Sequence, residues 1–539
     1  MAASGPVYAE DGGYPFASYH GPGTSPANST WTDSKGNPIS PYGYYFRNCT
    51  DYVAWKLQSL GVADGKTRSL GNAAAWSARA KGKNLTVDGS PSVGAAAIST
   101  AGTYGHVGFV EETHSDGTIT ISEYNYKLDG TYSTRSGTPS RLGFTQFIHF
   151  EKLMASAAIE PAPPRVPWYF ETIDGDPGSL GRTDHNAGQS PAAVSYGDSL
   201  QLFYYDEDQH ALHHAWADSS GWHFEYLDGT GGSSGRVNYD VGRTPYAVVF
   251  GNALHVFYYD AANGNVRHAW SNDSGWHFET LDGDSGSISH AALDVGIEPV
   301  AVVYGTSLQL FYFNASAHTL RHAWMVDQGW HFETLDGDVG ALSRYTGDVG
   351  RTSCAVVFAG GLHVYAYDQS GGHLRHEWSD TNGWHFENLD GDRGSIGHQD
   401  GPVGAYSAVT MYGGTMQLFY YDQAHGALRH AWASEEKGWQ FESLEGSTSF
   451  RVGAMPSVTA IGDSIQVFYY DSTFGNLRHA WTSSTTGWQF ENLDGAGGDN
   501  PGRLKADVGY DAVALNFNET LHVFYFDNTN GNLRHSRPY

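Results

Sequence analysis

A short pattern, Trp-x-Phe-Glu, recurs seven times in the C-terminal two thirds of this 539-residue chain. The spacing is 54 residues for the first four intervals, then 55 and 49. Self-similarity at a nearly fixed period is typical of an array in which each repeat is one supersecondary unit that packs on its neighbours. The copies begin at Trp168, Trp222, Trp276, Trp330, Trp384, Trp439 and Trp488.

Each repeat predicts four short strands. In one copy, apolar or alternating segments cover Ala247–Phe250, Leu254–Asp260, Val266–Trp270 and Trp276–Leu281. Turn-forming residues separate these segments, and none is long enough for an ordinary helix. Four short strands per repeat indicate a propeller blade and not a helical solenoid.

The two ends of the array predict the number of blades. The first Trp-x-Phe-Glu copy precedes any complete blade, and the last blade ends after Leu533–Ser536 without a fourth strand. A strand around Trp168 is therefore expected to pair beside Leu533–Ser536, which removes exposed edges. We predict a seven-bladed β-propeller over residues 168–539. The strand pattern Phe-Tyr-Tyr-Asp, or a variant, likewise occurs seven times, beginning at Phe203, Phe257, Phe311, Tyr365, Phe419, Phe468 and Phe524.

Charge separates this array from the N-terminal part. The chain carries 30 Lys and Arg against 58 Asp and Glu, yet residues 1–155 hold 12 of each sign, so the whole excess of −28 lies C-terminal. An acidic surface argues against binding nucleic acid or anionic lipid non-specifically. Residues 155–167 are rich in Pro and Ala and predict an extended linker between a domain at 1–154 and the array.

The N-terminal domain holds Cys49, one of two cysteines in the chain. Val53, Leu57 and Leu60 recur behind it at helical spacing, and Gly61 is a candidate C-cap. A thiol at a helix N-terminus meets unpaired N–H groups and the helix dipole, which favour the thiolate. The alternative is a small buried thiol that begins a core helix.

The second cysteine, Cys354, falls in an apolar strand and is expected in the core, so we expect no disulfide. The first residues of the chain show no signal peptide, and no apolar run is long enough to span a bilayer. We therefore expect no membrane insertion, and secretion after removal of a signal or by another route.

A predicted hairpin places an imidazole near polar groups. Strands over 106–112 and 118–126, joined by a two-residue turn at Asp116-Gly117, put His106 on the side that carries Glu123 and Asn125. A thiol, an imidazole and a polar orienter together indicate a cysteine amidase or peptidase. The alternatives are a hydrogen-bonded strand histidine and a solvated strand face.

In this hypothesis Cys49 attacks an amide carbonyl, and His106 takes the thiol proton and passes it to the leaving amine. Glu123 or Asn125 holds the other ring nitrogen. Asn48 or the backbone N–H of Cys49 is the candidate that stabilises the oxyanion.

Three segments resemble the motif blocks of CHAP domains, which are cysteine- and histidine-dependent amidohydrolases and peptidases of the papain-like type. They are Asn48–Val53, Gly105–Val110 and Ile121–Asn125, and the resemblance covers roughly residues 14–153. It implies an α+β fold and cleavage of amide bonds in peptidoglycan or related peptides. The implied roles are Cys49 as nucleophile, His106 as base, Glu123 as orienter and Asn125 as a further polar group of the active site.

The chain departs from this pattern in two places. Many relatives have a Gly-Gln-like pair before the cysteine, where this chain has Arg47-Asn48, which bears on the oxyanion role of Asn48. Many also carry a Gly-Asp-Val/Ile-Ala strand before the histidine, where this chain reads Ser92–Ile98. The second departure bears on substrate preference more than on catalysis.

The array resembles lectin-type propellers of bacteria and fungi, which implies carbohydrate binding. A sugar site needs an aromatic surface and groups that bond hydroxyls. The alternative for these residues is blade-to-blade packing, and the repeat after Trp439 has lost residues behind Leu444. The glycan-binding candidates are Arg267, Arg321, Arg375, Arg429, Arg478, Arg534, Trp276, Trp330 and Trp384.

Asp-Gly-Asp loops, as at Asp282–Asp284, lack the longer series of oxygen ligands of a calcium loop and predict turns. We expect no metal and no cofactor. The favoured hypothesis is a secreted peptidoglycan hydrolase held near its wall substrate by a multivalent propeller that binds surface glycans. The alternative is a lectin or adhesin whose N-terminal domain is inactive or acts on an amide outside the wall.

Overall fold

The computed structural model describes residues 39–150 and 168–538, apart from short gaps, together with Tyr14. The gaps are 60–61, 63, 115–116, 182, 232–234, 290–293, 328, 398, 436, 449, 484–486 and 496–502. The chain divides into two compact units, Met1–Arg165 and Val166–Tyr539. The expected linker at 155–167 lies outside the described residues. Within the described part, no helix has the length and apolar character needed to cross a membrane.

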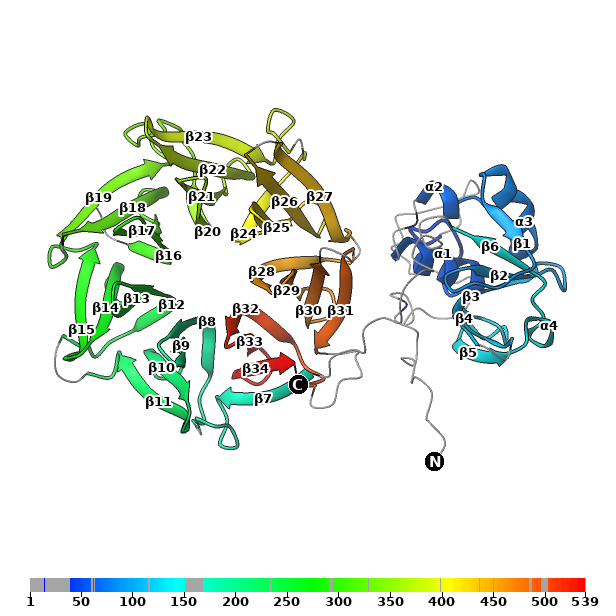
Figure 1. Cartoon of the computed structure of the whole chain (residues 1–539), viewed down its shortest axis with the longest axis horizontal. Helices are drawn as coiled ribbons and strands as arrows, with labels where there is room; N and C mark the ends of the chain where they lie inside the picture. Colours follow the sequence, from blue (N-terminus) through cyan, green and yellow to red (C-terminus); the bar gives the residue numbers. More distant parts are fainter. Residues whose placement is uncertain are drawn as a thin grey trace. The chain divides into compact units, whose positions relative to one another are not determined.

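The N-terminal unit is an α+β domain with one antiparallel sheet in the order β1-β6-β2-β3-β4-β5 (Figure 1). Its helices are α1 (Cys49–Ser59), α2 (Asp64–Thr67), α3 (Ala73–Gly82) and α4 (Pro139–Leu142). Its strands are β1 (Thr86–Asp88), β2 (Ala96–Ser99), β3 (His106–Thr113), β4 (Ile119–Tyr124), β5 (Tyr132–Gly137) and β6 (Gln146–His149).

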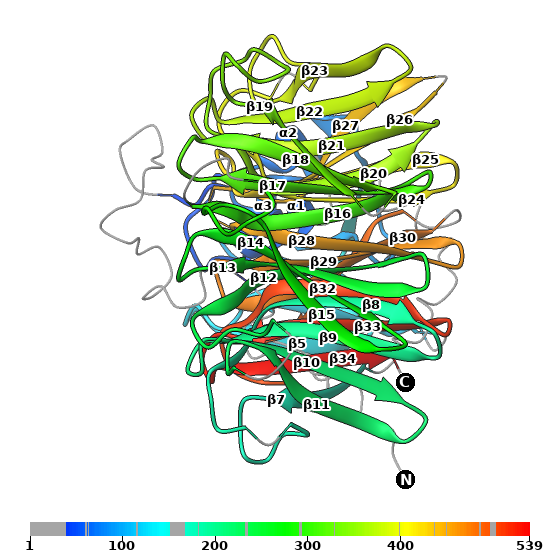
Figure 2. The same cartoon turned by 90° about the vertical axis from the view of Figure 1, so that its left-hand side faces the viewer.

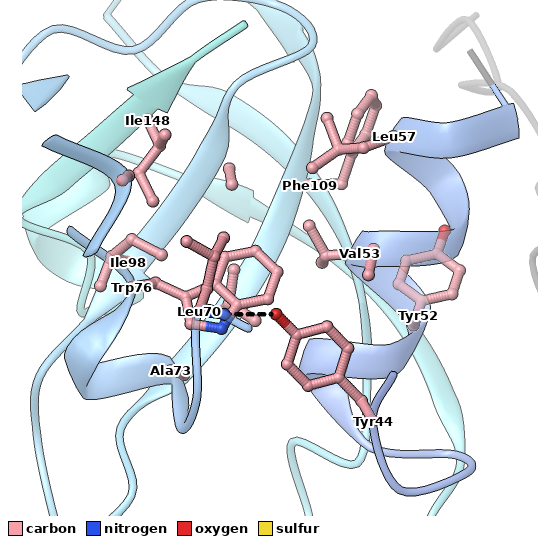
Figure 3. Close-up of a cluster of buried hydrophobic side chains, with 14 of the residues drawn as sticks. Tyr44, Tyr52, Val53, Leu57, Leu70, Ala73, Trp76, Ile98, Phe109 and Ile148 are labelled. Atoms are coloured by element: carbon pink, nitrogen blue, oxygen red, sulfur yellow. Dashed lines mark hydrogen bonds between the residues drawn. The ribbon is translucent and has the colours of Figure 1, made fainter. Parts of the chain in front are cut away.

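Helix α1 begins at Cys49, so the predicted helix start is confirmed. Val53 and Leu57, four residues apart, lie on one helical face and are fully buried. They join a core with Phe109 of β3 and Trp76 of α3 (Figure 3). This packing holds α1 against β3, the strand that begins with His106. The expected C-cap, Gly61, lies outside the described residues.

The hairpin of β3 and β4 has a different register from the one predicted. His114 donates its N–H to the carbonyl of Thr118 at 2.8 Å, whereas the predicted turn would place His114 opposite Ile119. Asp116 of that predicted turn lies outside the described residues. A bulge at Glu111 then shifts the pairing, and Val110 lies opposite Ile121. Before the bulge the total displacement is two residues, so the side chains from His106 to Val110 keep their predicted faces relative to β4. His106 and Glu123 therefore share one face, as expected.

In the described part of the C-terminal unit, the strands form seven antiparallel sheets of four (Figure 1). Six sheets are built from consecutive strands, and the last combines β32, β33 and β34 with β7, the first strand of the unit. Leu533 pairs with Asp174 and Ser536 with Phe170, which confirms the predicted pairing of the two ends. The strands predicted within the repeat are likewise confirmed.

The bounds of these strands repeat regularly. The first three sheets hold β8 (Ala187–Tyr196), β9 (Ser199–Asp206), β10 (Ala211–Asp218), β11 (Gly221–Asp228), β12 (Val241–Phe250), β13 (Ala253–Asp260), β14 (Asn265–Asn272), β15 (Gly275–Asp282), β16 (Val295–Tyr304), β17 (Ser307–Asn314), β18 (Thr319–Val326) and β19 (Gly329–Asp336). The next two hold β20 (Val349–Phe358), β21 (Gly361–Asp368), β22 (His373–Asp380), β23 (Gly383–Asp390), β24 (Val403–Tyr412), β25 (Thr415–Asp422), β26 (Ala427–Ser434) and β27 (Gly438–Gly446). The last two hold β28 (Val452–Ile461), β29 (Ser464–Asp471), β30 (Asn476–Ser483), β31 (Gln489–Asp494), β32 (Val508–Phe517), β33 (Thr520–Asp527), β34 (Asn532–Pro538) and β7 (Trp168–Asp174).

Neighbouring sheets touch through their first strands: β8 contacts β12, and so on in chain order to β32, which contacts β8 (Figures 1 and 2). The Trp of Trp-x-Phe-Glu fills the space between sheets. Trp276 lies edge-on to Phe203 and His214 of the preceding sheet, with ring centroids 6.1 and 5.4 Å apart. Trp222 of the first sheet packs in the same way on Phe524 of the last.

Candidate active site

Cys49 lies half-buried at the first residue of α1. The carbonyl of the preceding residue, Asn48, accepts the N–H of Asp51 at 3.1 Å and of Tyr52 at 3.0 Å. These bonds make Asn48 the N-cap residue of α1. The thiol of Cys49 therefore lies in the first turn, where the helix dipole favours an anion.

His106 and Glu123 form a direct pair beside this thiol. The Nε2 atom of His106 lies 2.8 Å from Oε2 of Glu123, whose side chain is fully buried, whereas the His106 side chain is 17% exposed. Because Nε2 is bonded to the carboxylate, Nδ1 is the ring nitrogen left for the thiol. Of the two orienters that the sequence left open, Glu123 is the one that bonds His106.

The surroundings raise the pKa of His106 and lower the pKa of Glu123. Burial alone would lower the pKa of His106, but hydrogen bonding to Cys49 and to Glu123 outweighs it and raises this pKa to about 9. Burial would raise the pKa of Glu123, but its bonds to His106 and Arg135 lower it.

Asn125 serves a different part of the site. Its Nδ2 donates to Oδ1 of Asn48 at 2.8 Å, and its Oδ1 accepts the N–H of Gly130 at 2.8 Å. The residue has a left-handed φ of 58°, which directs its amide from the end of β4 toward the start of α1. Asn125 therefore fixes Asn48, the residue before the nucleophile candidate.

Two further groups of this site escape the sequence pattern. Asp51 is fully buried, accepts hydrogen bonds from the hydroxyls of Tyr14 and Ser40, and has its pKa raised to about 7 by burial. The Tyr14 hydroxyl in turn accepts the N–H of Arg47 at 3.2 Å, which ties down the chain just before Cys49. The motif Asn-Cys-Thr-Asp contains Asp51 but carries no signal of this buried network.

The second group that the sequence pattern misses is Arg135 of β5. It bonds both oxygens of Glu123, and its Nη2 lies 3.0 Å from Oε2. The alternation of β5 could have indicated it, because Ser133 pairs with Glu123 and Arg135 lies two residues further on the same face.

The arginines predicted to bind glycans lie between sheets, and all but the partly buried Arg478 are buried. Arg321 bonds Asp282 of the preceding sheet through Nε at 3.2 Å and Nη2 at 2.8 Å, and the Tyr312 hydroxyl reaches the same carboxylate at 2.7 Å. This burial favours packing, the alternative weighed for these residues. The same pairing joins Arg267 to Asp228, Arg375 to Asp336, Arg429 to Asp390, Arg478 to Glu445 and Arg534 to Asp494.

Of the tryptophans, Trp330 and Trp384 pack on the preceding sheet, as Trp276 does. Trp276 also lines a cleft of about 560 Å³ between the first two sheets. Trp216, Tyr196, Asp198 and Asp218 line it as well, and no Lys or Arg occurs among its described lining residues. In the described part of the chain, no group of three or more His, Cys, Asp or Glu side chains is placed to hold a metal ion.

Cys354 lies on β20 in the core, 8% exposed, and burial raises the pKa of its thiol to about 12. A neutral buried thiol of this kind is unreactive at physiological pH.

The N-terminal unit is similar to known proteins. Residues 39–125 match the model of the CHAP domain. The probable autolysin LDP of Staphylococcus aureus is 39% identical over 113 residues, which cover 21% of this chain and 39% of that protein. The staphylococcal secretory antigen SsaA of the same species is 33% identical over 126 residues, covering 23% of this chain and 48% of the antigen. The chain thus spans less than half the length of these relatives.

Two solved structures show weaker likeness. The N-acetylmuramoyl-L-alanine amidase from Staphylococcus aureus is 28% identical, with a TM-score of 0.18, over 23% of this chain and 35% of that one. The polysaccharide lyase Uly1 is 11% identical, with a TM-score of 0.37, over 64% of this chain and 88% of that one. Residues 39–125 of the N-terminal unit are a CHAP domain, followed by a large all-β region of four-stranded sheets.

Proposed function

We propose that the N-terminal unit is a cysteine-dependent hydrolase of amide bonds in bacterial peptidoglycan, either an N-acetylmuramoyl-L-alanine amidase or a peptide-bridge endopeptidase. The observation that carries this proposal is the His106–Glu123 pair next to a half-exposed thiol at a helix N-terminus. The names of the relatives, an autolysin and an amidase, supply the substrate class.

In the proposed mechanism, the Cys49 thiolate attacks the amide carbonyl and a tetrahedral oxyanion forms. The backbone N–H of Cys49 and the amide of Asn48 are the donors that would stabilise it, with Asn48 held by Asn125. The His106 imidazolium then protonates the leaving amine, which leaves a thioester on Cys49. Water, deprotonated by neutral His106, hydrolyses the thioester and restores the thiol, while Glu123 keeps the ring oriented throughout.

The test is loss of turbidity of purified bacterial cell walls, with wild type compared with Cys49→Ala. Clearing by the wild type alone supports the nucleophile and the substrate class, and mass spectrometry of the released fragments then names the bond. If neither protein clears walls from several species, the result supports the alternative of an inactive domain or of a substrate amide outside the wall.

We propose further that the C-terminal unit is a seven-bladed β-propeller that binds surface glycans. The cyclic order of contacts between first strands, from β8 to β32 and back to β8, supports the propeller. The cleft beside Trp216 and Trp276 supports the binding role, because its aromatic edges, carboxylates and hydroxyls suit a neutral sugar.

This second role has its own test. At the position of Ser271, which lines the cleft, the next sheet has Met325, so Ser271→Met is expected to fill the space with a side chain the repeat tolerates. The variant should lose binding on an array of neutral saccharides. Ser379→Met, at the equivalent position of another sheet, is the matched control and should keep it. Unchanged binding by both would remove this cleft from the proposal.

Such a protein would act outside the cell, at the wall. The relatives named autolysin and secretory antigen support this location. A glycan site on the same chain would hold the hydrolase near its substrate and raise the effective substrate concentration.

A further inference from the structure

The Glu123 carboxylate is shared between two cations. Its Oε2 accepts from Nε2 of His106 at 2.8 Å and from Nη2 of Arg135 at 3.0 Å, while its Oε1 accepts from Nε of Arg135. Ser133 adds a longer bond to Oε1 at 3.4 Å. The bidentate grip of a guanidinium fixes the plane of a carboxylate, which a single bond to an imidazole does not.

Arg135 is itself held in place. Its guanidinium carbon lies 3.7 Å from the centroid of the Tyr126 ring, and its Nη1 lies 3.4 Å from the carbonyl oxygen of Leu142 at the end of α4. The side chain is only 21% exposed. Tyr126 also lies edge-on to His106 with ring centroids 5.5 Å apart. Arg135, Tyr126, Glu123 and His106 thus form one packed group, unlike a mobile surface arginine and its partner.

We propose that Arg135 is a positioning residue: it holds the Glu123 carboxylate in the orientation that presents His106 to Cys49. This inference deepens the proposed hydrolase function and rests on it. The side chain of Arg135 bonds Glu123 and the carbonyl of Leu142, so it acts on His106 through Glu123. Its second effect is electrostatic. The positive charge of Arg135 offsets the negative charge of Glu123, so the carboxylate raises the pKa of His106 less than it would alone.

The experiment compares Arg135→Ala and Arg135→Lys with wild type in the full-length chain. The first readout is the rate of Cys49 alkylation by iodoacetamide from about pH 5 to 11, measured by mass spectrometry of the Cys49 peptide, because thiolate reactivity needs no substrate. The second is kcat and KM on solubilised wall fragments. Arg141→Ala, an exposed arginine on α4, is the matched control.

For Arg135→Ala we expect kcat to fall about 10- to 100-fold with little change in KM, less than the loss of the base itself. Without the guanidinium, the pKa of His106 should rise above its value of about 9, so the alkaline limb of the alkylation profile moves to higher pH. Arg135→Lys keeps the charge without the bidentate grip, so the limb should stay in place while kcat recovers only partly. Arg141→Ala should match wild type in both readouts.

The proposal is overturned if Arg135→Ala lowers the melting temperature but leaves the alkylation limb and kcat unchanged, since Arg135 would then only link β5 to α4. It is also overturned if Arg135→Ala and Arg141→Ala behave alike. If wild type clears no wall, the hydrolase proposal fails, yet the alkylation profile still decides whether Arg135 controls the pair of His106 and Cys49.

Discussion

Both units of this chain place histidine and arginine side chains against carboxylates, but the two arrangements differ in whether a ring nitrogen remains for another group. In the N-terminal unit, His106 bonds Glu123 through one nitrogen and keeps the other for the thiol. In the repeat unit, His322 bonds Glu333 through Nδ1 at 2.8 Å and Gln309 through Nε2 at 2.7 Å. The same side chains therefore differ in how much of their hydrogen-bonding capacity is already used.

The pKa values follow this difference. Hydrogen bonds to Cys49 and Glu123 raise the pKa of His106 to about 9 against the effect of burial. Burial lowers the pKa of His322, because its bond to Glu333 does not compensate for the lost solvent. A histidine paired with a carboxylate is thus a poor sign of catalysis unless one ring nitrogen remains available to a reactive group.

The largest expected effect is the loss of His106 in the N-terminal unit. His106→Gln removes the base, so the rates of wall hydrolysis and of Cys49 alkylation near neutral pH should fall by about 10²- to 10⁴-fold. His322→Gln, the control in the repeat unit, should leave both rates unchanged and lower only stability. Equal losses in the two variants would contradict the separation of roles.

The next effect concerns stability on the repeat side. Arg321→Met removes the guanidinium that pairs with the fully buried Asp282, so the free energy of unfolding should fall by about 3–5 kcal/mol. Denaturant unfolding followed by tryptophan fluorescence would measure it. Arg393→Met, which removes an exposed pair with Asp400, should cause no measurable change. If both variants unfold alike, the inter-sheet pairs are not the stabilising contacts inferred here.

A smaller effect on stability is expected in the fourth sheet, which lacks a tyrosine that the other described sheets share. In the described part of the other six sheets, a tyrosine hydroxyl reaches the carboxylate of the preceding sheet, as Tyr312 reaches Asp282. The fourth sheet has Ala366 at that position and the buried Glu377 beside it, whose carboxyl faces that of Asp336. Burial and the charge of Asp336 raise the pKa of Glu377 well above its usual range.

Replacing both residues, as Ala366→Tyr with Glu377→Ala, restores the arrangement of the other sheets. We expect the double variant to gain about 1–3 kcal/mol, because a buried carboxyl that faces another carboxyl is replaced by a hydroxyl that donates to it. Thermal unfolding of the two single variants and of the double variant gives the coupling between the sites. A coupling near zero would mean that the two positions do not substitute for one another.

The smallest effect is a pH dependence. In three sheets a second histidine takes the place of the glutamine that bonds the repeated histidine: His255, His363 and His522. Burial, and then the charge of the neighbouring histidine, lowers the pKa of His255 and His522 to about 3 and that of His363 to about 4.

Because these folded-state pKa values lie below the unfolded value of about 6.5, the unfolded chain binds more protons in acid. The stability of the repeat unit is therefore fully present above about pH 6.5 and falls as the pH drops toward 4. Replacing the three histidines by Gln, as in the other sheets, should raise the melting temperature by a few degrees at pH 5 and leave it unchanged at pH 8. Equal shifts at both pH values would exclude protonation as the cause.

Much of the repeat architecture follows from the sequence. The period of the Trp-x-Phe-Glu pattern, the four apolar segments per repeat and the unmatched strand at Trp168 predict the strands and the pairing of β7 with β34. Local patterns suffice here because each repeat packs against nearly the same neighbours. The residues that make these contacts therefore recur in each repeat. The helix start at Cys49 and the shared face of His106 and Glu123 are of the same local kind.

Only the tertiary structure decided what each polar side chain does. It buried the repeat arginines against carboxylates of the preceding sheet, where sequence reasoning offered them as sugar ligands. It brought Arg135 from a third strand onto Glu123 and directed Asn125 to Asn48. These roles depend on contacts between segments far apart in the chain and on burial, which a residue's identity and spacing do not encode.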